Sequence, residues 1–189
     1  MRPYIPFLGF LSLLAVILAV CLPVCNQPST VAPVDAGDCD AGSCALPIPL
    51  APRTEYSQEN WRFTVPGEGW ISGKPRIDEL KLMAMNENNG AIVILLKEST
   101  TDTFAQYVVG TIRDYSVDGN VISSAKQVVI NGNKYVEAQV NTENTIVWSW
   151  ITVKDGFGYS LGCGGGVNPD GGSSLYDLCQ DIAHTIELQ

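Results

Sequence analysis

Positive charge and histidine are scarce in this sequence. Among 189 residues, 11 are Lys or Arg and 20 are Asp or Glu, which gives a formal net charge of −9, and His184 is the one histidine. This balance repels phosphate groups, and no basic stripe follows the chain, so nucleic acid is excluded as a primary partner. A zinc site built on histidines needs more than one of them. Helical spacing from Leu175 places His184 on the polar side of the last helix, so we expect no metal site and no triad base there.

Residue sets that could carry catalysis are also missing. Ser and Thr are plentiful, but none has a matching base in the sequence, and no pair of carboxylates is marked as a buried acid and base. We interpret the closely spaced carboxylates as solvated faces and expect a protein that is not an enzyme and that has no cofactor. These carboxylates are Asp78 and Glu79, Glu137 and Glu143, and Asp177 and Asp181.

The N-terminus contains a long uncharged run. Residues 7–24 carry no charge, and Arg2 is the one charge before Asp35. Residues 1–25 are therefore expected to be a signal peptide or a signal anchor that directs the rest of the chain across a membrane. Cys21 and Cys25 are lipidation candidates, although each follows a Val where a bacterial lipoprotein usually has a small residue. Lipidation and an uncleaved helix both remain open, and we expect a membrane-anchored, extracytoplasmic protein on the periplasmic or cell-surface side.

Residues 26–54 are rich in Pro, Ala, Asp and Gly and have no periodic apolar pattern. Such a segment cannot bury enough apolar surface to order itself, so we predict a flexible stalk. Cys39 and Cys44 lie within it and are expected to close a small disulfide loop outside the cytoplasm.

Residues 55–189 have the pattern of a folded domain. Apolar residues make up 46% of the whole sequence, the usual share for a globular protein. Short turns between consecutive strands predict an α+β fold in which a mostly antiparallel sheet of about six or seven strands is covered by two helices. The predicted strands are 62–66, 80–84, 91–96, 128–130, 135–140, 145–153 and 157–163, and the predicted helices are 101–116 and one that starts after Ser173 and Ser174.

Two cysteines of this domain lie on neighbouring predicted elements. Cys163 ends the last strand of the predicted sheet, and Cys179 faces inward on the last helix, so we predict a disulfide between them that pins the helix to the sheet. The run Gly162–Gly166 joins strand to helix as phosphate loops do, but no Gly-Lys-Ser/Thr follows it. A flexible connection is the expectation for this run.

Four tryptophans are the remaining candidates for a binding surface. Trp148 and Trp150 share one strand face, which is core if a helix covers it and a binding surface if it is open. Trp61 and Trp70 lie near the two ends of the first predicted strand and are the next candidates, with an edge cover over the core as the alternative.

A short motif at the start of the domain resembles a known fold group. Phe63-Thr64-Val65-Pro66, followed by Gly69-Trp70, is similar to the opening of the PsbP-like fold group, which includes the DcrB-like lipoproteins of bacteria. The resemblance implies the same order of elements, ending in a helix on the sheet, and a non-enzymatic accessory or binding role in the cell envelope.

Two functions follow from these observations. The first is a membrane-tethered domain that docks another envelope protein. The second is a small-ligand carrier or sensor with an aromatic-lined pocket between sheet and helices.

Overall fold

The structure is a computed structural model that describes residues 52–73, 78–166 and 173–189. The described residues belong to one compact unit, residues 51–189. The predicted signal segment, residues 26–51 of the predicted stalk, the lipidation candidates and the predicted Cys39–Cys44 disulfide lie outside the described residues.

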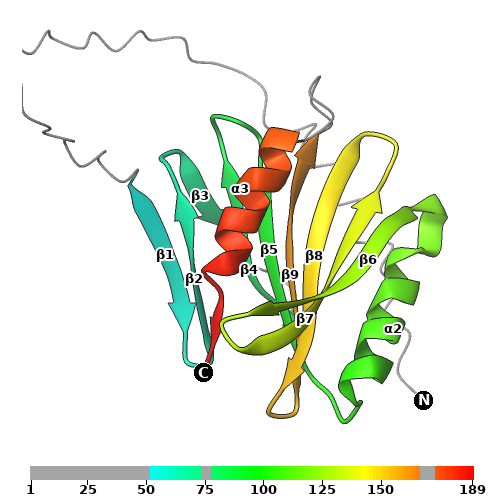
Figure 1. Ribbon diagram of the computed structural model, residues 1–189. Helices are drawn as coiled ribbons and strands as arrows, with labels where there is room; N and C mark the ends of the chain where they lie inside the picture. Colours follow the sequence, from blue (N-terminus) through cyan, green and yellow to red (C-terminus); the bar gives the residue numbers. More distant parts are fainter. Residues whose placement is uncertain (1–51, 74–77, 167–172) are drawn as a thin grey trace, which may run out of the picture. The chain divides into compact units, whose positions relative to one another are not determined.

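The described chain forms two antiparallel sheets and two α-helices (Figure 1). A seven-stranded sheet has the order β3-β4-β5-β9-β8-β7-β6, and a smaller sheet has the order β1-β2-β10. The strands are β1 (Arg53–Gln58), β2 (Trp61–Pro66), β3 (Trp70–Gly73), β4 (Leu80–Asn86), β5 (Ile92–Ser99), β6 (Val121–Ile130), β7 (Asn133–Asn141), β8 (Thr145–Lys154), β9 (Phe157–Gly166) and β10 (Glu187–Leu188). The helices are α2 (Phe104–Tyr115), the 3₁₀ turn η1 (Val117–Gly119) and α3 (Ser173–His184).

The predicted antiparallel α+β architecture with two helices is confirmed, and it contains more strands than the sequence indicated. Strands β1, β3 and β10 were not predicted, because they are short or mostly exposed and show no clear alternation of apolar and polar residues. Strand β1 begins at Arg53, two residues before the predicted start of the domain.

Tight turns fix the order of the strands. Asn131 and Gly132 have φ angles of 48° and 77°, and they join β6 to β7 with Ile130 opposite Asn133. Both residues are in the left-handed region, as a type I′ hairpin turn requires. Asp155 and Gly156 adopt the same conformation between β8 and β9. Both Asn-Gly and Asp-Gly signals in the sequence therefore mark turns of the structure.

The two helices pack on opposite faces of the seven-stranded sheet. On β8, the Ser149 side chain is bonded to Tyr115 of α2, while the ring of its neighbour Trp148 packs against Tyr176 of α3. Neighbouring side chains of a strand point to opposite faces of a sheet, so α2 and α3 cover different faces. The smaller sheet lies with α3, which packs against β2 as well as β9 and β8 (Figure 1).

Helix α2 starts later than predicted because Thr103 caps it. The Thr103 side chain accepts a hydrogen bond from the Gln106 amide, and the Gln106 side chain accepts one from the Thr103 amide. This reciprocal pair satisfies two amide groups that would otherwise lack a partner at the start of a helix. The inward side chains Tyr107, Val108 and Tyr115 are buried, in agreement with the predicted face.

Candidate functional site

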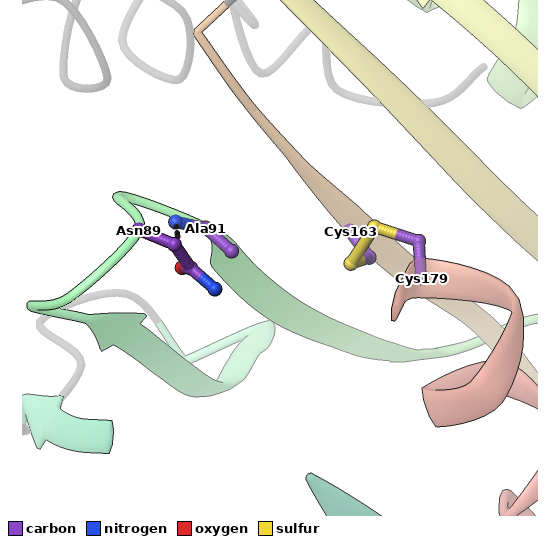
Figure 2. Close-up of a disulfide and its surroundings, with 4 residues drawn as sticks. All are labelled: Asn89, Ala91, Cys163 and Cys179. Atoms are coloured by element: carbon purple, nitrogen blue, oxygen red, sulfur yellow. Dashed lines mark hydrogen bonds between the residues drawn. A yellow bond between two sulfur atoms is a disulfide. The ribbon is translucent and has the colours of Figure 1, made fainter. Parts of the chain in front are cut away.

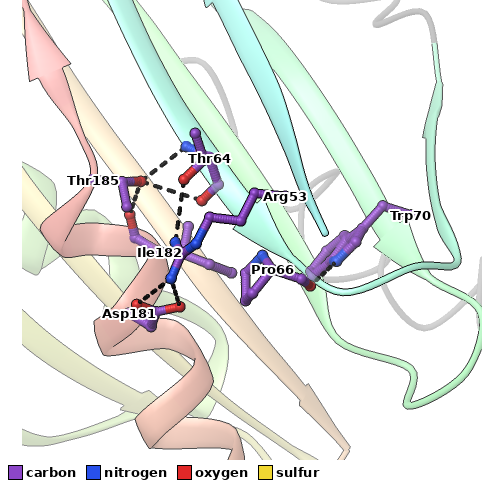
Figure 3. Close-up of polar contacts among 7 residues, drawn as sticks. All are labelled: Arg53, Thr64, Pro66, Trp70, Asp181, Ile182 and Thr185. Carbon is purple, nitrogen blue, oxygen red and sulfur yellow. Dashed lines mark hydrogen bonds and ion pairs between the residues drawn. The ribbon is translucent and has the colours of Figure 1, made fainter. Parts of the chain in front are cut away.

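Three of the four candidate tryptophans lie in the core. Trp61, Trp148 and Trp150 are 2%, 5% and 1% exposed. Trp70 is half-buried, and its indole N–H donates to the Pro66 carbonyl at 2.9 Å (Figure 3). All three rings belong to the hydrophobic core, so of the two alternatives that the sequence left open the structure selects core packing for Trp61, Trp148 and Trp150 and not a binding surface. The Trp70 side chain packs against the edge of the hydrophobic core and is not a free surface group.

The predicted Cys163–Cys179 disulfide is present in the structure (Figure 2). The two Cα atoms are 5.5 Å apart, and both side chains are fully buried. The bond joins the centre of β9 to the middle of α3. Because solvent does not reach either sulfur, the bond serves packing rather than redox exchange.

The glycine run belongs to a strand and is not a flexible connection. Gly162–Gly166 lies within β9, which is bonded to β5 on one side and to β8 on the other. A Cβ at Gly164 would overlap the Ile146 carbonyl oxygen and lie 2.7 Å from the Cα of Val147. The glycine at this position therefore permits close approach of two backbones, and the expectation of a flexible connection was wrong.

Glu137 is a buried carboxylate, which corrects its interpretation as part of a solvated face. It accepts hydrogen bonds from Gln180 Nε2 at 2.7 Å, from the Tyr176 hydroxyl at 3.1 Å and from Trp150 Nε1 at 3.3 Å. Lys126 Nζ completes the set with an ion pair of 3.0 Å. Buried charges require such partners. With its oxygens bonded by groups of β6, β8 and α3, Glu137 holds α3 on the sheet.

A second buried polar cluster lies beneath α2. The Tyr115 hydroxyl is 2.6 Å from Ser160 Oγ and 3.0 Å from Ser149 Oγ, and the two serine oxygens are 2.8 Å apart. Burial raises the pKa of Tyr115, so its hydroxyl stays neutral and cannot act as a base near neutral pH. The cluster satisfies the polar groups of the α2 interface and has no arrangement for nucleophilic catalysis.

The C-terminal end of α3 is fastened to the smaller sheet (Figure 3). Arg53 forms an ion pair of 2.9 Å with Asp181. The Thr185 hydroxyl donates to the Ile182 carbonyl at 2.7 Å and accepts from the Thr64 amide at 2.8 Å. These contacts hold the end of α3 on the smaller sheet.

His184 is exposed, as expected, and its Nε2 lies 3.1 Å from Gln180 Oε1. Within residues 52–73, 78–166 and 173–189, no group of three or more His, Cys, Asp or Glu side chains is arranged to hold a metal ion. None of the helices in those ranges is long and apolar enough to cross a membrane.

Strand β6 forms an open edge of the seven-stranded sheet. It is ten residues long and pairs on one side with β7. Most of its side chains are exposed, including Val121 at 59% and Val129 at 67%. No hydrogen bond from another part of the described chain, apart from β7, reaches the backbone of residues 121–129. Half of the backbone groups of this strand are therefore available to a partner.

The other sheet edges are shorter than β6, and one of them carries charges of both signs. Strand β3, at the opposite edge of the large sheet, is four residues long. Strand β1 carries charges of both signs at Arg53 and Glu55. Short length and charge are the usual means by which proteins discourage pairing at an edge. Strand β6 has a register shift between Ile122 and Ser124 and one charge, Lys126.

The sequence pattern did not identify β6 as a candidate site. Residues 128–130 were predicted as a strand, but residues 123–127 are small or polar and show no apolar alternation. A signal was nonetheless present, because an Asn-Gly hairpin pairs two strands of similar length and the segment after Gly132 is nine residues long.

The fold is similar to two solved structures. The solution structure of cyanobacterial PsbP from Synechocystis sp. PCC 6803 matches with a TM-score of 0.57 and 16% identity, covering 79% of this chain and 99% of that one. The Saccharomyces cerevisiae Ran-binding protein Mog1p matches with a TM-score of 0.52 and 10% identity, covering 73% and 96%. No protein-family model and no curated protein matches the sequence. The likeness establishes a PsbP-like fold, as the sequence motif predicted.

Proposed function

We propose that this protein is a non-enzymatic accessory module, tethered to a membrane on the extracytoplasmic side, that docks another protein of the cell envelope. The open edge of β6 is the observation that carries this proposal. An exposed strand edge binds an extended segment through main-chain hydrogen bonds, a common mode of protein recognition. The PsbP-like fold agrees with such a role but does not supply it, because one fold hosts many functions.

The interior of the described domain favours docking over the carrier function. Trp150, Tyr135 and Phe63 are fully buried between the sheet and its cover, where a carrier would need an aromatic-lined pocket. The Glu137 carboxylate in the same interior accepts hydrogen bonds from Gln180, Tyr176 and Trp150. We therefore place the functional surface outside the core, at the sheet edge.

A crosslinking experiment on the full-length chain in its native membrane tests the docking function. A photoreactive residue is placed at Gln127 in β6 or, as the matched control, at Gln58 in β1, which is also an exposed glutamine of an edge strand. We expect one specific adduct, mapped to a single partner segment, from position 127 and its loss when Ala125→Pro is added. No adduct, or equal adducts from both positions, would refute docking at β6.

The membrane tether has its own test. Intact mass of the protein extracted from its native membrane should match a chain that begins at Cys21 or Cys25 and carries acyl groups, or else the full-length chain with an uncleaved anchor. A mass that corresponds to a trimmed chain without acyl groups would contradict tethering by residues 1–25.

A further inference from the structure

We propose that the occupant of the β6 edge is an acidic, extended segment that adds to the large sheet as an eighth strand. This inference rests on the proposed docking function and specifies the chemistry of the partner. Two features of the hairpin formed by β6 and β7 carry it: the direction of the free backbone groups, and the sign of the exposed charges.

The register of the hairpin determines which backbone groups of β6 are free. In a hairpin with a two-residue turn, the pair that flanks the turn exchanges both hydrogen bonds, and bonded pairs then alternate with unbonded ones. Ile130 opposite Asn133 is that flanking pair. Val128 and Lys126 therefore bond to β7, while Val129, Gln127 and Ala125 direct their N–H and C=O groups away from the sheet.

The exposed charges of this hairpin are positive, in contrast with the chain as a whole. Lys126 has a side chain 57% exposed and is ion-paired with Glu137 at 3.0 Å. Lys134 is exposed opposite Val129, and its Nζ lies 5.6 Å from the centre of the Phe104 ring. The one carboxylate of the hairpin, Glu137, is 6% exposed and faces inward. A chain with 11 basic and 20 acidic residues thus contains a hairpin whose own carboxylate is not exposed. Complementary charge steers an acidic segment to this edge and away from the rest of the surface.

The neighbouring side chains leave room for an added strand. Ser123, Ser124 and Ala125 are small and exposed, and Val129 offers apolar surface next to Lys134. An incoming strand with β-branched residues and interspersed carboxylates would place apolar groups near Val129 and negative charge near the two lysines. Pairs of opposite charge and of β-branched residues are the contacts that stabilise neighbouring strands.

A second copy of this chain fits the edge less well. Its β6 would bring no carboxylate to Lys126, and each copy carries a net charge of −9. Repulsion between two whole copies therefore opposes self-pairing, whereas a short acidic segment carries fewer negative charges and can place them beside the lysines.

The test uses a pair of synthetic peptides and the full-length chain in detergent. The first, acetyl-Thr-Val-Asp-Val-Thr-Asp-Val-amide, is acidic, and the second has Lys in place of each Asp. We expect the labelled acidic peptide to bind by fluorescence anisotropy at least ~10-fold more tightly than the basic one, because charges of like sign oppose the latter. Its affinity should fall as salt is raised. Hydrogen exchange should slow in β6 and stay unchanged in β1.

Matched variants separate backbone pairing from charge. Ala125→Pro removes an outward N–H and should weaken the acidic peptide about 10-fold, whereas Ala125→Thr keeps the N–H and should not. Lys134→Gln should weaken it about threefold without altering hydrogen exchange in the free protein. Equal affinity for both peptides, or protection outside β6, would overturn the acidic-strand proposal.

The outcome can be distinguished from failure of the docking function. If crosslinks from position 127 map to a neutral or basic partner segment, the docking function stands and the acidic chemistry is wrong. If they map to β6 of a second copy, self-pairing replaces the acidic strand. If position 127 gives no specific crosslink at all, the docking function itself fails.

Discussion

Strands β6 and β9 have the same length and opposite surroundings. Each is ten residues long, but β9 is paired on both sides and buried along most of its length, whereas β6 is paired on one side and exposed. Both contain small residues, glycines in β9 and Ser or Ala in β6. In β9 the missing side chains let the chain's own elements approach, and in β6 the small side chains leave space for an element from outside. The role of small residues in a strand therefore depends on what lies beside that strand.

The largest contrast should come from glycine substitutions in β9. Gly164→Ala places a Cβ against the backbone of Ile146 and Val147, which cannot move aside as a side chain could. We expect the free energy of unfolding to fall by about 3 kcal/mol or more, measured by urea denaturation. Gly162→Ala is the matched control, because its Cβ would lie 3.7 Å from Val147 Cγ1, an ordinary contact. Equal losses in the two variants would show that close backbone approach does not explain the glycine.

Removal of the disulfide should have a similar or slightly smaller effect. Cys163 and Cys179 are 16 residues apart in sequence, and a crosslink over such a loop contributes roughly 3 kcal/mol. The double variant Cys163→Ala with Cys179→Ala should lower the urea midpoint accordingly. The double variant Ser123→Ala with Ser124→Ala in β6 should change stability by less than ~0.5 kcal/mol. A comparable loss in β6 would contradict the comparison between the two strands.

Alkaline pH should destabilise the folded domain through its buried tyrosines. Burial raises the pKa of Tyr107 and of Tyr135, and repulsion from Glu98 adds to the shift at Tyr107. Both hydroxyls stay protonated in the folded state, whereas in the unfolded chain they ionise near pH 10. The contribution of these two tyrosines to the free energy of unfolding is therefore fully present below pH ~10. Above that pH the free energy of unfolding should decrease, by up to about 1.4 kcal/mol per pH unit for each tyrosine.

Urea midpoints measured from pH ~8 to pH ~11 check the alkaline effect. Tyr107→Phe should reduce the slope, because one of the tyrosines with a raised pKa is gone. An unchanged slope in this variant, or a flat profile in the native protein, would show that these tyrosines do not govern alkaline stability.

The smallest expected effect is in β6 itself. Ala125→Pro removes a backbone N–H that points to solvent, so the free energy of unfolding should change by less than ~1 kcal/mol. Lys126→Pro removes an N–H that is bonded to β7, so its free energy of unfolding should be about 3 kcal/mol lower than that of Lys126→Ala. The Lys126→Ala variant is the control, because it also loses the ion pair with Glu137. Thermal denaturation of the three variants checks the order. Equal losses at positions 125 and 126 would place the free backbone groups elsewhere.

Features with a local cause were predictable from the sequence. The Asn131–Gly132 turn, helix α2 and the Cys163–Cys179 bond each depend on residues close in sequence or on a clear apolar spacing. Burial of Glu137 was not predictable, because its partners come from three other elements. Strand β1 was missed for the same reason: its mostly polar sequence forms a strand because β2 pairs with it.

The open edge could be predicted in part. A partner strand for β7 was implied by the Asn-Gly turn, but the position of β6 at the end of the sheet depends on the order of all seven strands. A hydrophobic pattern reports which residues avoid water. It does not report which backbone groups lack a neighbour, and that property forms the candidate site here.

Pairing of β10 with β2 has a consequence for how the chain acquires its fold. Glu187 and Leu188 align with Arg62 and Trp61, and the Arg62 side chain bonds to Glu187 at 2.6 Å. Asn131, in the turn after β6, donates to the Ile186 carbonyl just before β10. Contacts between residues this far apart in sequence form late, since a long loop must close first. We therefore expect β10 to join the smaller sheet after β1 and β2 have paired, and removal of residues 187–189 should leave Trp61 with less cover.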